Sequence, residues 1–295
     1  ANGLHENVPE DEAHDLFALP NFINTMMENK WLGSKTGQGF YKKIKKDDGS
    51  SEIKSLDLDS MEYRDQKRAS FATLEMTKTI DNVADRFEVL INGKDKAGDF
   101  YRKNFSALFA YVSNRIPEIT DELYKIDDAM RAGFGWEHGP FQIWDAIGVK
   151  KGIEMMKEEG YEPNSWVTEM LENGSDSFYT VQEGNTYYYD IDQKTQVKVP
   201  GQDAFIILDN IRESKEVFKN SGVVVEDLGD GILNVEFRSK MNSIGGDVLD
   251  GINKAIDIAE KEYQGLVVAN NGKNFSVGAN IGMIFMMAVE QEYDE

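Results

Sequence analysis

The spacing of apolar residues changes once along this chain, and that change limits the folds open to it. Between residues 65 and 171, apolar residues recur at intervals of three, as at Phe105, Leu108 and Tyr111. This period is typical of amphipathic helices, and repeated over a hundred residues it predicts a helix bundle. Residues 177–200 instead carry short β-rich runs around a Gly-Asn turn, which indicates a β-hairpin or small meander.

From Val223 onward, a third pattern begins, in which strand-like and helix-like runs alternate. Such alternation is typical of an α/β unit. The expected elements are two strands, a helix, a third strand and a second helix: 223–227, 232–237, 247–263, 265–270 and a helix from Ile281. Because no core has closed by Glu295, we expect this last domain to be truncated.

The first sixty residues are harder to interpret. A helix is expected over 22–30, followed by a structured loop at 31–42, where three glycines in seven positions break a helix and allow positive φ. Residues 42–62 are rich in Lys, Asp and Ser, which predicts a solvated connection between helical units. The chain opens without methionine in what resembles a connecting segment, so we expect it to be an internal piece of a longer protein.

The overall charge excludes some classes of partner. A formal charge of -21 opposes long-range attraction to nucleic acid or to an anionic membrane. No apolar run reaches the roughly 20 residues of a membrane span, and no secretory signal is seen, so we expect a cytoplasmic protein.

There are no cysteines, and no His, Asp and Glu cluster has ligand spacing, so we expect no metal site. A polyanionic ligand would have to rely on local lysines, backbone N–H groups and helix ends.

The most informative stretch is residues 133–148, which combines glycines, two tryptophans and a proline before a helical run. It predicts a tight turn between helices, with Phe141, Trp144 and Ile147 on one face filling a core or an interface. His138 could act as a general base. A lone histidine in such a turn is more often a polar cap or spacer, and we favour that interpretation.

Residues 127–148, Asp-Asp-Ala-Met-Arg-Ala-Gly-Phe-Gly-Trp-Glu-His-Gly-Pro-Phe-Gln-Ile-Trp-Asp-Ala-Ile-Gly, resemble the signature of the C-terminal helical domain of 3-hydroxyacyl-CoA dehydrogenases. Residues 33–41 resemble the loop that ends the first helical repeat of that family. The resemblance covers about residues 10–172 and implies a domain that packs on an NAD domain, closes over acyl-CoA and often carries subunit contacts. The family's G-x-G-x-x-G loop and catalytic histidine motif are absent here, so we expect no oxidation by this chain alone.

The second chemical element is the loop at 273–281, Lys-Asn-Phe-Ser-Val-Gly-Ala-Asn-Ile, between a strand and a helix. Backbone N–H groups at such a junction can bind an anion, and Gly278 would let a ligand oxygen come close. For a lone glycine loop, an ordinary β-α turn is the more common explanation.

This loop resembles the oxyanion-hole motif of crotonases, with Phe275, Gly278, Ala279 and Asn280 in the matching places. The resemblance implies that the Ala279 N–H binds the thioester oxygen as an enolate forms, and that Ser276 and Gly278 flank coenzyme A. Asn280 stands where the family frequently has Asp, so the role of that side chain is open.

Residues 238–244 resemble the crotonase loop near the phosphates and adenine of coenzyme A, with Ser239 in place of the usual proline. Arg238 or Lys240 could counter a phosphate, or either could be an ordinary solvated charge, and Asn242 is expected to hold the turn into the next helix. Hydration of an enoyl thioester, the reaction that this resemblance implies, also needs carboxylates to activate water. The nearest acids are Glu290, Glu292 and Glu295. Their default explanation is the charged end of a helix.

Together these features predict a mainly α chain that ends in an α/β unit. The expected regions are the end of a first helical repeat with its linker, a second dehydrogenase-type helical repeat, a β-hairpin linker, and the start of a crotonase domain: 1–62, 63–176, 177–221 and 222–295. The resemblances imply a β-oxidation enzyme that oxidises 3-hydroxyacyl-CoA with NAD and hydrates enoyl-CoA. NAD would be bound by a domain missing from this chain, and the enzyme could be a homodimer. The alternative is a non-catalytic acyl-CoA-binding or dimerisation module.

Overall fold

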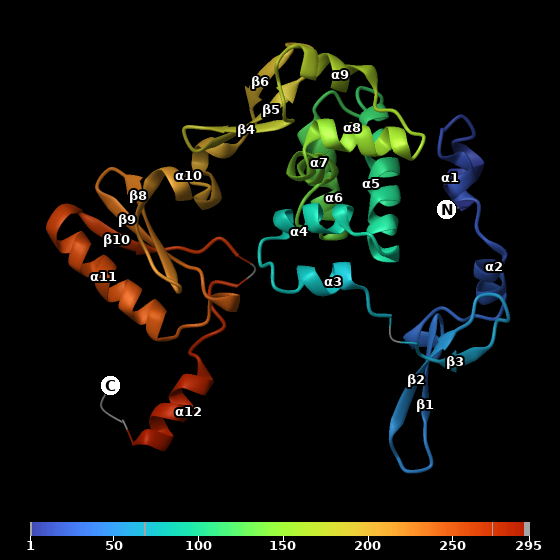
Figure 1. Ribbon diagram of the computed structural model, residues 1–295, viewed down its shortest axis with the longest axis horizontal. Helices are drawn as coiled ribbons and strands as arrows, with labels where there is room; N and C mark the ends of the chain where they lie inside the picture. The colour runs from blue at the N-terminus through green and yellow to red at the C-terminus, as the bar shows by residue number, and fades with distance from the viewer. Residues whose placement is uncertain (1, 68, 273, 292–295) are drawn as a thin grey trace. The chain divides into compact units, whose positions relative to one another are not determined.

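The protein folds into a mixed α/β structure, in which helices are joined by three separate small sheets (Figure 1). The expectation of a mainly α chain is corrected by these sheets. The computed structural model describes residues 2–67, 69–272 and 274–291. Two compact units are present, Ala1–Tyr111 and Val112–Glu295, and the division between them falls inside helix α5 (Lys96–Asn114) rather than at a loop.

The first unit begins with short helices and contains one sheet. Its elements are α1 (Asn2–Asn7), η1 (His14–Phe17), α2 (Asn21–Glu28), η2 (Ser34–Thr36), β1 (Tyr41–Lys45), β2 (Ser51–Leu56), β3 (Tyr63–Asp65), α3 (Ala72–Thr77), α4 (Val83–Asn92) and most of α5. The expected helix at 22–30 is α2. The glycine loop that follows is structured, as expected, with Gly33 and Gly37 at φ of 117° and 86°.

The segment interpreted as a solvated linker is instead a three-stranded antiparallel sheet, so that prediction is wrong. Composition misled because the strands alternate between an exposed, lysine-rich face and a face that packs around Leu56 and Tyr63. The ring of Tyr63 lies 5.8 Å from that of Trp31, and its hydroxyl donates to the Gly39 carbonyl at 2.6 Å. These contacts fix the sheet to the glycine loop.

The second unit continues with the predicted helices, here α6 (Leu123–Phe134), α7 (Pro140–Ile147), α8 (Val149–Glu158) and α9 (Ser165–Glu172). The predicted meander also forms, with β4 (Tyr179–Gln182), β5 (Asn185–Asp190) and β6 (Thr195–Lys198) in sequential order. Its first turn is formed by Glu183 and Gly184, both at positive φ, rather than by the expected Gly184 and Asn185.

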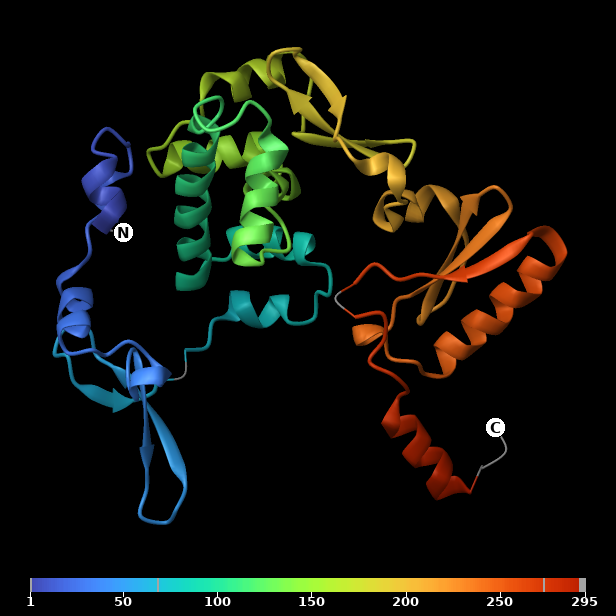
Figure 2. The same cartoon turned by 180° about the vertical axis from the view of Figure 1, so that it is seen from behind.

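The chain then passes η3 (Gln202–Ala204) and α10 (Leu208–Lys215) into the predicted α/β unit (Figure 2). Its strands β7 (Glu216–Lys219), β8 (Val223–Gly229), β9 (Ile232–Phe237) and β10 (Gly265–Val268) form one sheet in the order β10-β9-β8-β7. Only β10 runs parallel, against β9. After η4 (Lys240–Asn242), helix α11 (Gly246–Glu262) covers one face, where it buries a core of Val, Leu and Phe side chains. The parallel pair with its crossover helix is what the alternating pattern predicted.

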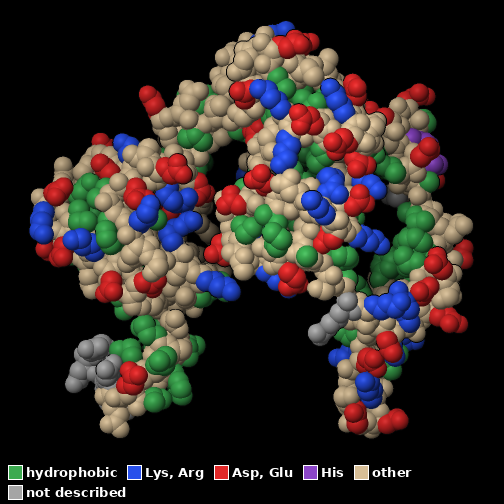
Figure 3. Space-filling model, in the orientation of Figure 1, with side chains coloured by type: hydrophobic (Ala, Val, Ile, Leu, Met, Phe, Trp, Pro, Cys, Tyr) green, Lys and Arg blue, Asp and Glu red, His purple; other side chains and the backbone are tan. Residues whose placement is uncertain are grey.

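The last helix, α12 (Ile281–Glu290), contains no buried residue. Its apolar side chains form an exposed cluster (Figure 3). Across the described residues, none of the helices has both the length and the apolar composition that a bilayer span requires.

Candidate functional site

The loop between β10 and α12 is joined to the segment before α11 by one short parallel bridge. The Ile244 N–H donates to the Gly278 carbonyl at 2.9 Å, and the Asn280 N–H donates to the Ile244 carbonyl at 2.8 Å. In a parallel bridge, the residue between these two bonds points its own N–H away from the partner strand. That residue is Ala279, the predicted oxyanion donor.

Asparagine and serine side chains hold the rest of this loop in place. The Asn270 side chain accepts from the Phe237 N–H at 2.6 Å and donates to the Phe275 carbonyl at 2.7 Å. Asn242 donates to the Asn274 carbonyl at 3.0 Å. These bonds take the place of a regular strand ladder, so they set the path of the backbone that leads to Ala279.

Ser276 links the two predicted coenzyme A loops directly. Its hydroxyl donates to the Asn242 carbonyl at 2.6 Å and accepts from the Gly278 N–H at 2.9 Å. Gly278 has a φ of 93°, a conformation that favours glycine. The Gly278 amide is therefore already paired within the protein. The Ala279 N–H makes no hydrogen bond to any described residue, and Ala279 is exposed.

An unpaired, exposed N–H beside a braced turn can donate to a carbonyl or enolate oxygen. The turn is not occluded, and one of its two amides is available. The described part of the loop thus retains one donor of the predicted oxyanion site, and the Gly278 amide is committed to Ser276.

The other predicted residues have mixed surroundings. Asn280 caps α12, where its side chain accepts from the Gly282 and Met283 N–H groups at 3.1 and 3.3 Å. Arg238 is exposed, and its guanidinium lies 3.4 Å from Glu236. Lys240 is exposed and has no ion pair with any described residue. Asn242 adopts a φ of 54° in η4, the turn before α11, and its side chain donates to the Asn274 carbonyl of the neighbouring loop.

Three residues considered in the sequence, Lys273, Glu292 and Glu295, lie outside the described residues. Glu290 is exposed at the end of α12. Among the described residues, no group of three or more His, Asp or Glu side chains is placed to hold a metal ion.

In the helical region, the turn before α7 requires its glycine. A Cβ on Gly139 would lie 2.3 to 2.4 Å from atoms of Asp127, so only glycine permits this approach. Asp127 accepts hydrogen bonds from the Phe141 and Gln142 N–H groups at 2.9 and 3.1 Å, at the start of α7. A carboxylate is favourable there because the first N–H groups of a helix lack partners.

The predicted apolar face of α7 is confirmed as a core. Phe141 and Trp144 are fully buried, and their rings lie 5.0 and 4.9 Å from that of Phe178, just before β4. Asp145 accepts from the Phe178 and Tyr179 N–H groups, both at 2.8 Å. Burial raises the pKa of Asp145 to about 7.

His138 is partly buried in the turn before α7. Burial lowers its pKa below the ordinary 6.5, which favours the neutral imidazole. This state suits a polar spacer, the interpretation that the sequence favoured.

Sequence reasoning missed a buried polar network on the sheet face opposite α11. Glu226, Asn234 and Glu236 are fully buried there. Arg212 of α10 donates to both carboxylate oxygens of Glu236, at 2.8 and 2.9 Å, and Asn234 donates to Glu226 at 2.9 Å. The alternation of Val225 with Glu226 in β8 was visible in the sequence, but the arrival of Arg212 from α10 was not. This face therefore buries paired charges beside the apolar side chain of Val224.

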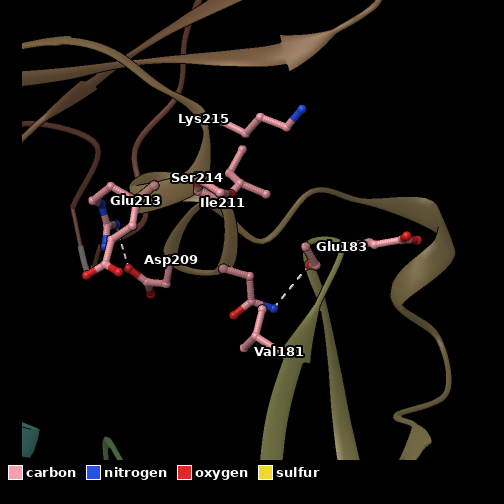
Figure 4. Close-up of a pocket in the computed structure, with 10 residues that line it drawn as sticks. Val181, Glu183, Asp209, Ile211, Glu213, Ser214 and Lys215 are labelled. Carbon is pink, nitrogen blue, oxygen red and sulfur yellow. Dashed lines mark hydrogen bonds and ion pairs between the residues drawn. The ribbon is translucent and has the colours of Figure 1, made fainter.

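A cavity of about 920 Å³ lies between the β4–β5 turn and α10 (Figure 4). Its walls carry charges of both signs, and Arg212 there is engaged by Glu236 and by Asp209. None of the predicted coenzyme A residues lines it. We assign it no ligand.

Comparison with known proteins identifies the helical region. Residues 107–187 match the 3-hydroxyacyl-CoA dehydrogenase, C-terminal domain, family. This span contains α6 to α9, β4, and the Asp127 and Asp145 contacts, so the resemblance inferred from residues 127–148 is confirmed.

Two curated relatives extend the match along the chain. A probable 3-hydroxyacyl-CoA dehydrogenase of Bacillus subtilis is 38% identical over 100% of this chain and 36% of its own length. A putative fatty acid oxidation complex trifunctional enzyme of Rickettsia felis is 22% identical over 96% of this chain and 35% of its own length. The chain therefore spans about a third of the length of these relatives. No solved structure matches it.

These matches support the dehydrogenase part of the sequence interpretation. The family match ends at residue 187, before the crotonase-like residues 222–295, so the role of the Ala279 loop stays a prediction.

Proposed function

We propose that the protein acts in fatty-acid β-oxidation as a 3-hydroxyacyl-CoA dehydrogenase, in which the chain provides the C-terminal helical domain. The observation that carries this proposal is the family match at residues 107–187, together with 38% identity along the whole chain to a protein named as a probable dehydrogenase. Two further relatives, both named as trifunctional enzymes of fatty acid oxidation, support the same metabolic setting.

NAD is the oxidant that this family implies, and the residues of this chain do not fit it. No G-x-G-x-x-G motif occurs anywhere in the sequence. The one parallel strand pair of the described residues, β9 with β10, leads into the asparagine-braced loop rather than into a glycine-rich phosphate turn. We therefore assign no step of hydride transfer to these residues and propose that NAD is bound by another domain of the same protein.

The contribution of the helical domain is then positional. Asp127 holds the start of α7, and Asp145 of α7 holds the backbone at Phe178. Phe178 closes the aromatic core between α7 and β4. Such a rigid block can present one surface to a partner domain and to an acyl thioester.

Oxidation is tested with the gene product that contains these residues. Given NAD and 3-hydroxybutyryl-CoA, it should form NADH, whereas the 295-residue chain alone should form none because it has no dinucleotide motif. Failure of the gene product to form NADH would refute the dehydrogenase proposal. NADH formation by the chain alone would show that the active site has been misplaced.

Enoyl-CoA hydration is a second candidate function, favoured by the unpaired N–H of Ala279. We propose that this group donates to the thioester oxygen as it becomes an enolate, while Ser276 and Gly278 shape the loop. The carboxylates that would activate water are not assigned to any residue of this chain.

The donor role can be tested by NMR on the 295-residue chain. Acetoacetyl-CoA should shift the Ala279 amide proton downfield, whereas coenzyme A without an acyl group should shift it much less. An unchanged Ala279 amide at saturating ligand would exclude the loop as an oxyanion site. In that case, a non-catalytic acyl-CoA-binding or dimerisation module would be the better description of this part of the chain.

A further inference from the structure

The three-stranded sheet of the first unit has two faces of different charge. Side chains alternate between the faces along each strand, and the pairing register joins the same face across strands. One face carries residues 42, 44, 52, 54, 56, 63 and 65. The opposite face, named here the lysine face, carries Tyr41, Lys43, Lys45, Ser51, Ile53, Ser55 and Arg64.

The charges of the first face are neutralised within the sheet. Lys54 pairs with Asp65 and Glu52, and Lys46 lies 3.2 Å from Glu52. Lys42 lies 5.3 Å from the centre of the Tyr63 ring, in a cation–π contact. Both carboxylates of the three strands, Glu52 and Asp65, are on this face.

The lysine face has no carboxylate among its residues, all of which the structure describes. Arg64 reaches Asp57 at 2.9 Å, beyond the end of β2. Lys43 and Lys45 are exposed, and neither side chain has an ion pair or hydrogen bond to any described residue. They stand about 7 Å apart along one strand. Tyr41, which is 62% exposed, continues the same row.

This face is unusual for a chain with a net charge of -21, because exposed lysines could readily find acidic neighbours. Two unpaired ammonium groups in a row attract a ligand with separated phosphates. An exposed aromatic ring next to them provides a surface on which a nucleobase can stack.

We infer that the lysine face binds the phosphoadenosine half of a coenzyme A thioester. Lys43 and Lys45 contact its phosphates, and Tyr41 stacks on its adenine. The choice of coenzyme A over other nucleotides rests on the proposed function, whereas the phosphate and base recognition rests on the sheet itself.

The test is calorimetric titration of the 295-residue chain with coenzyme A. The double variant Lys43→Ala/Lys45→Ala should weaken binding about fivefold, and Tyr41→Ala about threefold. Lys46→Ala is the matched control, since it removes the same charge from the opposite face and should leave binding unchanged. Dephospho-coenzyme A should bind more weakly than coenzyme A, and pantetheine should not bind.

Three results would overturn the inference. In the first, the double variant and the native chain bind coenzyme A equally well. In the second, the amide shifts caused by coenzyme A occur only at residues 276–280, which would retain the proposed hydratase site and reject this one. In the third, the chain binds vesicles containing phosphatidylglycerol but not coenzyme A, which would make the lysine face a membrane contact. Binding at the lysine face by a gene product without dehydrogenase or hydratase activity would support this site and reject the proposed function.

Discussion

The Tyr179 hydroxyl donates a hydrogen bond of 2.8 Å to the carboxylate of Asp127, across 52 residues of sequence. Asp127 also accepts from two N–H groups at the start of α7, so one carboxylate joins α6, α7 and β4. Burial raises the pKa of Asp127 to about 6, although the three donors favour its ionised form. The first strand of the meander is thereby tied to the helical domain.

Removing this hydroxyl should destabilise the second unit. We expect Tyr179→Phe to lower the free energy of unfolding by about 1 kcal/mol, because the buried carboxylate loses one of its three donors. Urea denaturation followed by circular dichroism measures the change. Tyr187→Phe is the control, since the Tyr187 hydroxyl makes no hydrogen bond to any described residue. Equal stability of the two variants would contradict a structural role for this bond.

The close approach at Gly139 gives a second prediction. Gly139→Ala should lower the free energy of unfolding by about 3 kcal/mol or more, because its Cβ would overlap Asp127 and force the turn apart. Gly133→Ala should instead raise the free energy of unfolding by about 0.5 kcal/mol, because alanine favours a helix more than glycine does. Nothing lies within 4 Å of a Cβ at that position in α6. In thermal unfolding experiments, the melting temperature should fall for Gly139→Ala and rise for Gly133→Ala. A neutral Gly139→Ala would show that the turn can open without cost.

The buried network on the sheet predicts a pH dependence. Burial raises the pKa of Glu226 from an ordinary 4.5 to about 7, and the neighbouring Glu236 adds to the effect. The folded protein thus retains a proton on Glu226 to a higher pH than the unfolded chain does. Its contribution makes the free energy of unfolding fall as pH rises from about 4.5 towards 7.

Glu226→Gln should abolish that part of the pH dependence. At pH 8 the variant should be more stable than the native protein, by on the order of 1 kcal/mol, because a neutral amide replaces a buried charge that has an unpaired oxygen. At pH 4 the two proteins should be nearly equal. Urea denaturation at both pH values measures the difference, and identical slopes against pH would rule out titration of Glu226 in this range. Asp127 and Asp145 are present in both proteins, so their titration cancels.

The serine bridge at the glycine loop can be tested by hydrogen exchange. Ser276→Ala removes the acceptor of the Gly278 N–H, so exchange of that amide should become about tenfold faster. Ser243→Ala is a local control, because its hydroxyl makes no hydrogen bond to any described residue. If the Gly278 amide exchanged equally fast in both variants, the bridge would not hold the loop in solution.

Several elements could be predicted from local patterns because their causes are local. The spacing of Phe141, Trp144 and Ile147 placed α7 in a core, and Pro140 marked where that helix begins. The strand and helix order after Val223 was likewise readable from periodicity. Composition failed at residues 41–65, since a sheet with one charged face resembles a linker when its residues are only counted.

In the candidate sites too, some features follow from the local sequence and others depend on the tertiary structure. The sequence determined by itself that a glycine turn follows a strand at 276–280, that the turn at 133–140 is tight, and that 127–148 carries a dehydrogenase-type pattern. Only the tertiary structure decided that the Gly278 amide is paired while that of Ala279 is not, and that Lys43 and Lys45 share an exposed face without acids. The reason is physical: backbone preference acts between neighbours in sequence, whereas the pairing of donors and charges depends on residues brought together from distant parts of the chain.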